Sequence, residues 1–346
     1  MLKLSLLKKI TFVLLGIVII LLVVNIVVTK FVSKNEPPKN REAISGIELD
    51  HKFKTALGNF GFSENWIVKK KLKDIVGDSL YSTYLVNVPK DVPIQLLNLE
   101  IKNLLWDYDI EINAEELIKT KKTLLKLTSG KHLKLAAEFI YSDDIKRQYG
   151  TTSFLVKDLP LSDEEILNSI LATPELYYCV LIPCEESKKS LSLLAKASKR
   201  YALLLNDNIT ELNFTLSDKL SENRIKKSIK EIVGAFYSAA FFIIDVQSDL
   251  FESNNFKIIE SELKKRGILL VHSSSLSVLA SSNVNAEDNF QNFMQTLQSK
   301  DEKVLLVSAD EFSSIINLIP AYRKIGFKFI YPGDIIIKNP SDLKQN

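Results

Sequence analysis

The sequence of 346 residues has few cysteines, few histidines and little net charge, and each shortage excludes a class of protein. Its two cysteines, Cys179 and Cys184, are five residues apart, which is too far for a disulfide along an extended strand. A disulfide framework and zinc-binding cysteine clusters are therefore excluded. Because 45 basic and 42 acidic residues leave a formal charge of only +3, the composition provides no basic face for nucleic acid.

Several catalytic and nucleotide-binding motifs are also missing. The sequence contains no G-x-S-x-G nucleophile elbow, no G-x-G-x-x-G loop and no Walker loop. The stretch "TSGKH" lacks the preceding glycine and the following helix of a phosphate loop, so we expect a turn between two strands there. His272 is followed by serines, but adjacent residues of a strand point to opposite faces, so no pair of nucleophile and base follows.

The N-terminus contains a long apolar run. "ITFVLLGIVIILLVVNIVV" (Ile10–Val28) has no charged residue and is long enough to cross a bilayer as a helix. Lysines before the run, at Lys3, Lys8 and Lys9, indicate that the N-terminus stays in the cytoplasm. No small-residue cleavage site follows, so we expect an uncleaved single-pass anchor in the cell membrane, with the rest of the chain periplasmic or extracellular.

The remaining chain changes its periodicity near residue 150. Residues 47–76 carry a weak helical pattern, and from residue 80 a strand, a helix and two or three further strands predict a small α+β domain. From residue 151, short apolar strands alternate with amphipathic helices, several starting with capping residues such as Ser162 and Ser221. The chain is therefore divided into a cytoplasmic tail (1–9), an anchor (10–32), a linker and helical segment (33–79), the small domain (80–143), an α/β domain (150–338) and a tail (339–346).

The alternation after residue 150 predicts an α/β fold with a parallel sheet buried on both faces. About seven strands are expected, the last of them within "FKFIYPGDIII". A distorted (β/α) barrel fits this number better than an open sheet, although a doubly wound sheet is the alternative.

In such barrels, functional residues stand at the carboxyl ends of the strands. Reading each strand end gives the candidate ligand-binding residues Lys157, Asp158, Asp207, Asp245, Ser248, His272, Ser273 and Ser308, with Gly333 and Asp334 after the last strand. Among them, Asp158, Asp245 and His272 are candidate catalytic residues. Tyr177, Tyr178 and Tyr331 are near strand ends as well, where they either stack on sugars or pack under loops.

The order of these segments resembles the divergent polysaccharide deacetylases, relatives of the NodB-type carbohydrate esterases, over residues 151–338. Five segments carry the resemblance: "VKDLPLSDEEI", "TPELYYCVLIPCEESKKSL", "IIDVQS", "LLVHSS" and "LLVSAD". The family opens with a strand ending in two aspartates, and here Lys157 stands in place of the first and Asp158 in place of the second. The resemblance implies a distorted (β/α) barrel and a metal-dependent hydrolase.

The resemblance also implies that most metal-site residues have been replaced. Where the family has an Asn-His-Met-Gly-Ser strand end, Asp245 replaces the histidine and only Ser248 is kept. His272 stands where an acidic residue is expected, and Ser308 replaces the last histidine. Of the three histidines, His51 and His132 precede the barrel, so a single imidazole remains for a metal that the family holds with two.

Two functions stay open at this point. In the first, a degenerate barrel without metal or other cofactor binds a cell-wall glycan or an envelope protein and does not catalyse. In the second, a divergent carbohydrate deacetylase uses zinc or another divalent metal in a rebuilt site, where Asp158, Asp245 and His272 converge. In the first reading, Asp158 pairs with Lys157 and the other two residues are polar strand ends.

Overall fold

The computed structural model describes residues 13–16, 41–70, 82–130, 132–147, 149–279 and 285–338. They form two compact units: unit 1 contains the chain up to Gly58 and Ser63–Ile145, and unit 2 contains Asn59–Phe62 and the chain from Lys146. The predicted anchor, residues 10–32, lies outside the described residues except for 13–16, which are helical. Among the described residues, no helix has both the length and the apolar character needed to cross a bilayer.

Unit 1 is a five-stranded mixed sheet with two helices. Its strands are β1 (Ile67–Lys70), β2 (Ser82–Pro89), β3 (Glu111–Leu117), β4 (Lys122–Ser129) and β5 (His132–Ser142), in the spatial order β1-β2-β5-β4-β3. The central pair, β2 and β5, is parallel and the other pairs are antiparallel. The helices are α2 (Gly46–Gly58) and α3 (Ile94–Leu104), which pack against each other.

The structure differs from the sequence-based boundary of the small domain. Both α2 and β1 precede residue 80, yet they belong to unit 1, and the helical pattern ends at Gly58. Phe53 of α2 stacks on Tyr84 and packs beside Phe139, so α2 supplies part of the core that β2 and β5 need. As an edge strand, β1 is largely exposed and therefore lacks the alternation that indicates a strand.

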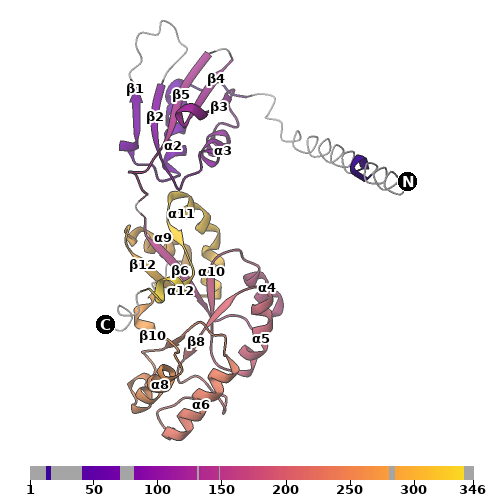
Figure 1. Ribbon diagram of the computed structural model, residues 1–346, viewed down its shortest axis with the longest axis vertical. Coiled ribbons are helices and arrows are strands. Elements are labelled where there is room, and N and C mark those ends of the chain that lie inside the picture. Colours follow the sequence, from indigo (N-terminus) through magenta and orange to yellow (C-terminus); the bar gives the residue numbers. More distant parts are fainter. Residues whose placement is uncertain are drawn as a thin grey trace, which may run out of the picture. The chain divides into compact units, whose positions relative to one another are not determined.

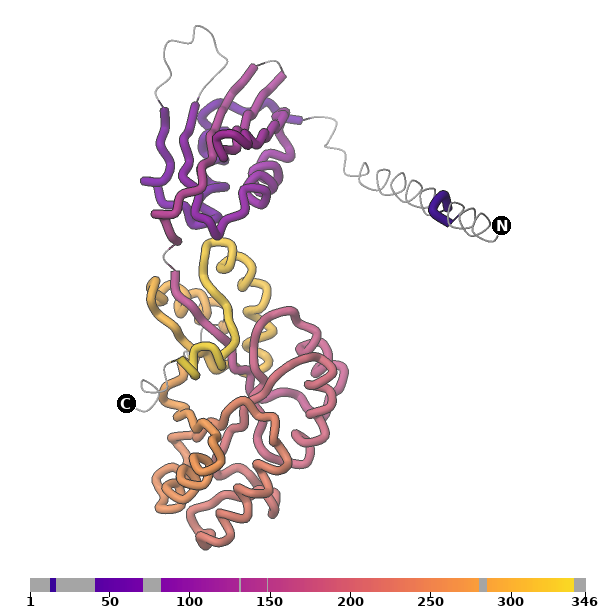
Figure 2. The backbone as a smooth tube through the Cα atoms, viewed as in Figure 1, coloured from indigo at the N-terminus to yellow at the C-terminus, as the bar shows by residue number. Residues whose placement is uncertain are grey.

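Unit 2 is built on a curled parallel sheet, a half-barrel (Figure 1). Its strands are β6 (Thr151–Lys157), β7 (Tyr177–Leu181), β8 (Arg200–Leu205), β9 (Phe242–Ile244), β10 (Leu270–His272), β11 (Ser277–Val278), β12 (Glu302–Ser308) and β13 (Lys328–Phe329). The path β10-β9-β8-β7-β6-β12-β11 contains seven strands, and β13 pairs with β6 beside it. Figure 2 shows magenta β6 running beside the orange and yellow end of the chain, where β12 and β13 lie. The α/β class predicted from the sequence is confirmed.

The helices of unit 2 cover the outer face of the half-barrel. The longer ones are α4 (Glu164–Leu171), α5 (Glu185–Lys196), α6 (Glu222–Ala235), α8 (Asn254–Lys265), α9 (Ala286–Thr296), α10 (Ala309–Ile315) and α11 (Ile319–Ile325), with a short α7 (Asp249–Glu252). Their apolar faces meet one side of the strands in a single buried cluster that includes Phe154, Ile229 and Phe312. A second cluster, which includes Leu155 and Val304, buries the other face, and burial on both faces explains why the strands read as continuous apolar runs.

The end of the chain differs from the prediction. "FKFIYPGDIII" forms only the two-residue β13, and its second half is the helix α12 (Pro332–Ile336). Pro332 has no N–H for a strand ladder but suits the first turn of a helix. Ile335 and Ile336 then join Leu155 and Val304 in a second buried cluster on the inner face. The interior of the half-barrel is thus filled by side chains of α12 and the strands.

Two predicted helix caps also differ from the sequence reading. α4 begins after Asp163, not Ser162, because the Asp163 carboxylate accepts hydrogen bonds from the N–H groups of Glu165 and Ile166, both at 3.1 Å. Ser221 stands at the N-cap of α6, but its side chain makes no cap hydrogen bond.

Candidate functional site

The carboxyl ends of the parallel strands of unit 2 meet at one edge of the half-barrel, which we call the carboxyl edge. In the strand register, Ser308 of β12 pairs with Lys157 of β6, and His272 of β10 pairs with Ile244 of β9, just before Asp245. The predicted residues Lys157, Asp158, Asp207, Asp245, Ser248, His272, Ser273 and Ser308 therefore all belong to this edge or to the turns directly after it. What each side chain contacts decides what the edge can do.

Lys157 and Asp158 form an ion pair. The ammonium nitrogen of Lys157 is 3.1 Å from an oxygen of Asp158, and the two side chains are 40% and 61% exposed. The backbone of Asp158 is left-handed, with φ of 55°, so the chain turns sharply here out of β6. An exposed pair of this kind places a positive charge where a metal ion would need a carboxylate.

The two other aspartates of the edge accept hydrogen bonds from backbone N–H groups. Both oxygens of Asp207 face the N–H of Leu250 in α7, at 3.0 and 3.3 Å. Asp245 accepts from the N–H of Gln247 at 3.0 Å and so closes its own turn. These carboxylates hold loops in place and are engaged by the protein itself.

The serines of the edge are also engaged. Ser248 donates to the carbonyl of Asp245 at 2.7 Å, and Ser273 accepts from the N–H of Val246 at 3.0 Å. Ser308 is the N-cap of α10 and forms a capping box with Glu311: its hydroxyl accepts the Glu311 N–H at 3.2 Å, while the Glu311 carboxylate accepts the Ser308 N–H at 2.7 Å. Each serine thus has a local structural role.

His272 is half-buried against aromatic rings. Its imidazole meets the rings of Phe251 and Phe256 edge-on, with centroid separations of 5.3 and 6.0 Å. The other two histidines, His51 in α2 and His132 in β5, belong to unit 1. In the part of unit 2 that the structure describes, the edge therefore offers one imidazole.

These residues do not fit the metal site that the family resemblance implies. Such a site needs two imidazoles and a carboxylate free to coordinate, with a further carboxylate as base. Here the carboxylates bind N–H groups or an ammonium, and the imidazole packs between rings. Within the described ranges, no group of three or more His, Cys, Asp and Glu side chains is arranged to hold a metal ion. The convergence of Asp158, Asp245 and His272 on one cation, which the second reading requires, is not found there.

The three tyrosines considered for sugar stacking lie away from the carboxyl edge. Tyr177 and Tyr178 begin β7 and are buried, at the opposite end of the strand. The Tyr177 hydroxyl donates to the carbonyl of Ile170 at 2.8 Å, and burial raises the pKa of this phenol. Tyr178 packs under α12, with Tyr331 at a centroid distance of 5.7 Å and Gly333 against its hydroxyl. Gly333 and Asp334 are likewise part of α12 and not a strand end.

One carboxylate near the carboxyl edge was not found from the sequence. Glu211, in the irregular segment after β8, accepts the N–H of Glu185 with both oxygens at 2.8 Å. It thereby meets the positive end of α5, whose N-cap is Cys184. No periodic pattern surrounds Glu211, and a contact across 26 residues leaves no local signal.

Comparison with known proteins gives matches among solved structures alone. No family model and no curated protein matches the chain. The matching structures include carbohydrate esterases of family 4. One is a family 4 pseudoenzyme, BA3943 from Bacillus anthracis, at 11% identity, covering 69% of this chain and 94% of that one, with a TM-score of 0.38.

Two further matches are described as enzymes. PdaA of Bacillus subtilis, a family 4 carbohydrate esterase, is 10% identical, with coverage of 55% of this chain and 82% of that one and a TM-score of 0.35. The catalytic domain of a peptidoglycan N-acetylglucosamine deacetylase from Eubacterium rectale is 12% identical, with coverage of 55% and 91% and a TM-score of 0.34. Carbohydrate esterases, the group that the sequence resembles, are thus represented among the matching structures.

Proposed function

We propose that this chain is a cell-envelope protein whose deacetylase-like half-barrel binds a glycan or a protein partner without hydrolysing it. One observation carries the proposal: the polar groups of the carboxyl edge are already used to build its loops. Asp207 and Asp245 accept backbone N–H groups, and Ser308 caps α10. A hydrolase of this kind would need such groups free for a metal ion, for water and for substrate.

The exposed part of the edge is left for recognition. Lys157 and Asp158 are accessible and lie side by side at the end of β6, and Asp207 is exposed as well. A partner that replaces the ion pair with its own hydrogen bonds would gain donors and acceptors already fixed in position. The rest of the edge supplies a rigid frame around them.

Metal content and hydrolysis test this proposal together. We expect the purified full chain, in detergent, to contain no stoichiometric divalent metal and to release no acetate from acetylated chito-oligosaccharides. Asp158→Ala and His272→Ala should leave both readings unchanged, and His51→Ala in unit 1 is the matched control. Stoichiometric zinc that Asp158→Ala and His272→Ala each remove, but that His51→Ala retains, would instead establish a rebuilt deacetylase site.

The membrane position is part of the same proposal. It is supported by the uncharged run Ile10–Val28 and by the lysines before it, which favour one membrane-spanning helix with unit 1 and unit 2 outside the cytoplasm. Protease added to intact spheroplasts should then degrade both units. Complete protection that disappears on lysis would contradict the proposed orientation.

A further inference from the structure

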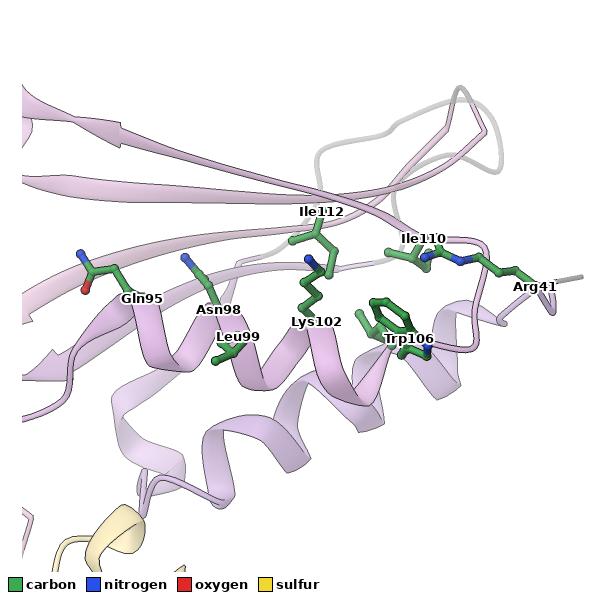
Figure 3. A pocket seen from close by; sticks show the side chains of 9 residues that line it. Arg41, Gln95, Asn98, Leu99, Lys102, Trp106, Ile110 and Ile112 are labelled. Carbon is green, nitrogen blue, oxygen red and sulfur yellow. The ribbon is translucent and has the colours of Figure 1, made fainter. Parts of the chain in front are cut away.

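Unit 1 contains a pocket of about 380 Å³ between α3 and the loop that leads into β3 (Figure 3). Its lining residues come from three short segments: Arg41, then Gln95, Asn98, Leu99, Lys102, Leu105 and Trp106 from α3 and the turn after it, and Ile110 and Ile112. Because β3 is an edge strand and is mostly exposed, the helix does not close against it. The space left between α3 and β3 is the pocket.

The lining is cationic and carries no acid. Gln95, Asn98 and Lys102 follow one another at helical spacings of three and four, so they share one face of α3. Figure 3 shows all three on the same side of the helix, with Lys102 reaching toward Ile112. Arg41 closes one end of the pocket. Two positive groups without a carboxylate among the nine lining residues favour a ligand with negative charge.

Two polar atoms at the pocket are buried without a partner in the described chain. They are the Nε of Arg41, a donor, and the Oδ1 of Asn98, an acceptor. Leaving such groups unpaired is costly, and native proteins rarely do so without a reason. A ligand with an acceptor for Arg41 and a donor for Asn98 would satisfy both.

The position of Arg41 is fixed by its neighbour. Glu42 donates its N–H to the carbonyl of Asp107 at 3.0 Å, and its own carbonyl accepts the N–H of Asp109 at 2.9 Å. The segment before α2 is therefore attached to the turn after α3. The backbone that carries Arg41 is thus held beside the pocket before any ligand arrives, which lowers the entropic cost of binding.

We propose that this pocket binds an acidic saccharide, a pyranose that carries a carboxylate. The carboxylate would pair with Arg41 and Lys102, and a ring hydroxyl would donate to Asn98. The C–H face of the sugar would pack on Trp106 and Ile112, as sugars do on aromatic and aliphatic side chains. A simple inorganic anion supplies no apolar face for Trp106 and Ile112. Because the site lies wholly within unit 1, it does not depend on the function proposed for the carboxyl edge.

The two tryptophans of the chain provide a direct test. In the full chain with Trp66→Phe, Trp106 is the only indole and its fluorescence reports the pocket. We expect glucuronate to change this fluorescence saturably, whereas glucose, which differs by the absence of the carboxylate, should not. Arg41→Gln and Lys102→Gln should each weaken glucuronate binding about tenfold, as expected for loss of one charge-assisted hydrogen bond.

Controls separate a built site from general charge. Lys119→Gln removes an exposed cation of unit 1 outside the pocket and should leave the affinity unchanged. Lys102 also lies in the last turn of α3, where a cation offsets the helix dipole, so unfolding of each variant is measured alongside binding. The proposal is overturned if glucuronate gives no saturable signal, if acetate or glucose gives the same one, or if anionic phospholipid vesicles alone give it.

Discussion

Asp50 and Glu262, two largely buried carboxylates, each have several donors around them. Asp50 of α2 accepts hydrogen bonds from Tyr84 and from Ser82, the latter at 2.7 Å, and its other oxygen is 3.1 Å from the Lys54 ammonium. Burial acts to raise the pKa of Asp50, but these hydrogen bonds outweigh it and lower that pKa. The same principle applies in α8 to Glu262, which faces Lys265 at 2.8 Å and Arg266 at 2.6 Å.

Glu262 gives the unfolding free energy a dependence on acid pH. Hydrogen bonds from Lys265 and Arg266 lower the pKa of Glu262 from 4.5 to about 2. The charged Glu262 therefore stabilises the folded protein at pH values above the pKa that Glu262 has in the unfolded chain. This stabilisation is lost as the pH falls toward the lower pKa that Glu262 has in the folded protein. In denaturant unfolding at pH 7, the wild-type protein should have a higher free energy of unfolding than Glu262→Gln. This difference in free energy should shrink as the pH falls from about 4.5 to 2. A difference that stays constant with pH would show that the carboxylate charge is not responsible.

At the scale of the element, the start of α10 on the carboxyl edge depends on a single hydroxyl, that of Ser308. Ser308 and Ser221 both occupy N-caps, but only Ser308 accepts a hydrogen bond from the backbone, within a capping box. The sequence pattern of serine followed by an acidic residue is therefore not sufficient to identify a working cap. The orientation of the serine hydroxyl decides it.

Ser308→Ala should lower the unfolding free energy by about 1 kcal/mol, because it leaves the Glu311 N–H without its acceptor. Ser308→Asp, which restores an acceptor at the N-cap, should recover most of the loss. Ser221→Ala is the matched control and should change stability little. Equal losses at Ser308 and Ser221 in denaturant unfolding would contradict this account of the cap.

The packing of α12 into the half-barrel depends on a glycine. A Cβ at Gly333 would lie 2.8 Å from the hydroxyl of Tyr178, whereas one at Gly234 in α6 would meet nothing within 4 Å. Gly333→Ala should therefore destabilise the protein by about 1–3 kcal/mol through overpacking. Gly234→Ala should stabilise it by about 0.5 kcal/mol, since alanine favours a helix.

A second change checks the cause of the Gly333 effect. Tyr178→Phe removes the oxygen that the new methyl group would meet, so the double variant should lose less stability than the sum of the two single changes. If the stability losses of the two single variants simply add in the double variant, measured by thermal or denaturant unfolding, contact with the Tyr178 hydroxyl is not the cause of the Gly333→Ala effect.

At the scale of the whole molecule, the chain has two compact units, each with its own sheet. β2 and β12, the strands that contain Val86 and Leu305, belong to different sheets. Each unit buries its own apolar side chains, around Phe139 in the first and Phe154 in the second. Local changes of stability should therefore be confined largely to one unit.

Hydrogen exchange can test this division. Asp50→Ala, which leaves the buried Tyr84 and Ser82 hydroxyls without their acceptor, should cost about 2–3 kcal/mol and speed amide exchange in β2 and β5. Gly333→Ala should instead speed exchange in β6 and β12, against which α12 packs. Equal acceleration in both sheets after either substitution would contradict independent units.

The sequence by itself determined the fold class of unit 2 and the composition of its carboxyl edge. Short apolar strands and amphipathic helices are set by local periodicity, so their alternation indicates a buried parallel sheet. The residue types at the strand ends, among them Lys157, Asp245, His272 and Ser308, could also be read from the order of segments, without coordinates. These inferences need no knowledge of which residues far apart in the chain are neighbours.

Tertiary structure alone decided what the polar groups do and how the half-barrel is filled. Asp207 meets the N–H of Leu250 across 43 residues, and no local pattern encodes such a contact. α12 occupies the interior because Ile335 and Ile336 find an unfilled apolar face, although the same residues also suit a strand. The cationic pocket likewise depends on Glu42 being attached beside Asp107 and Asp109, which brings Arg41 to the helix that carries Lys102. Long-range packing and hydrogen bonding, unlike periodicity, are properties of the folded chain.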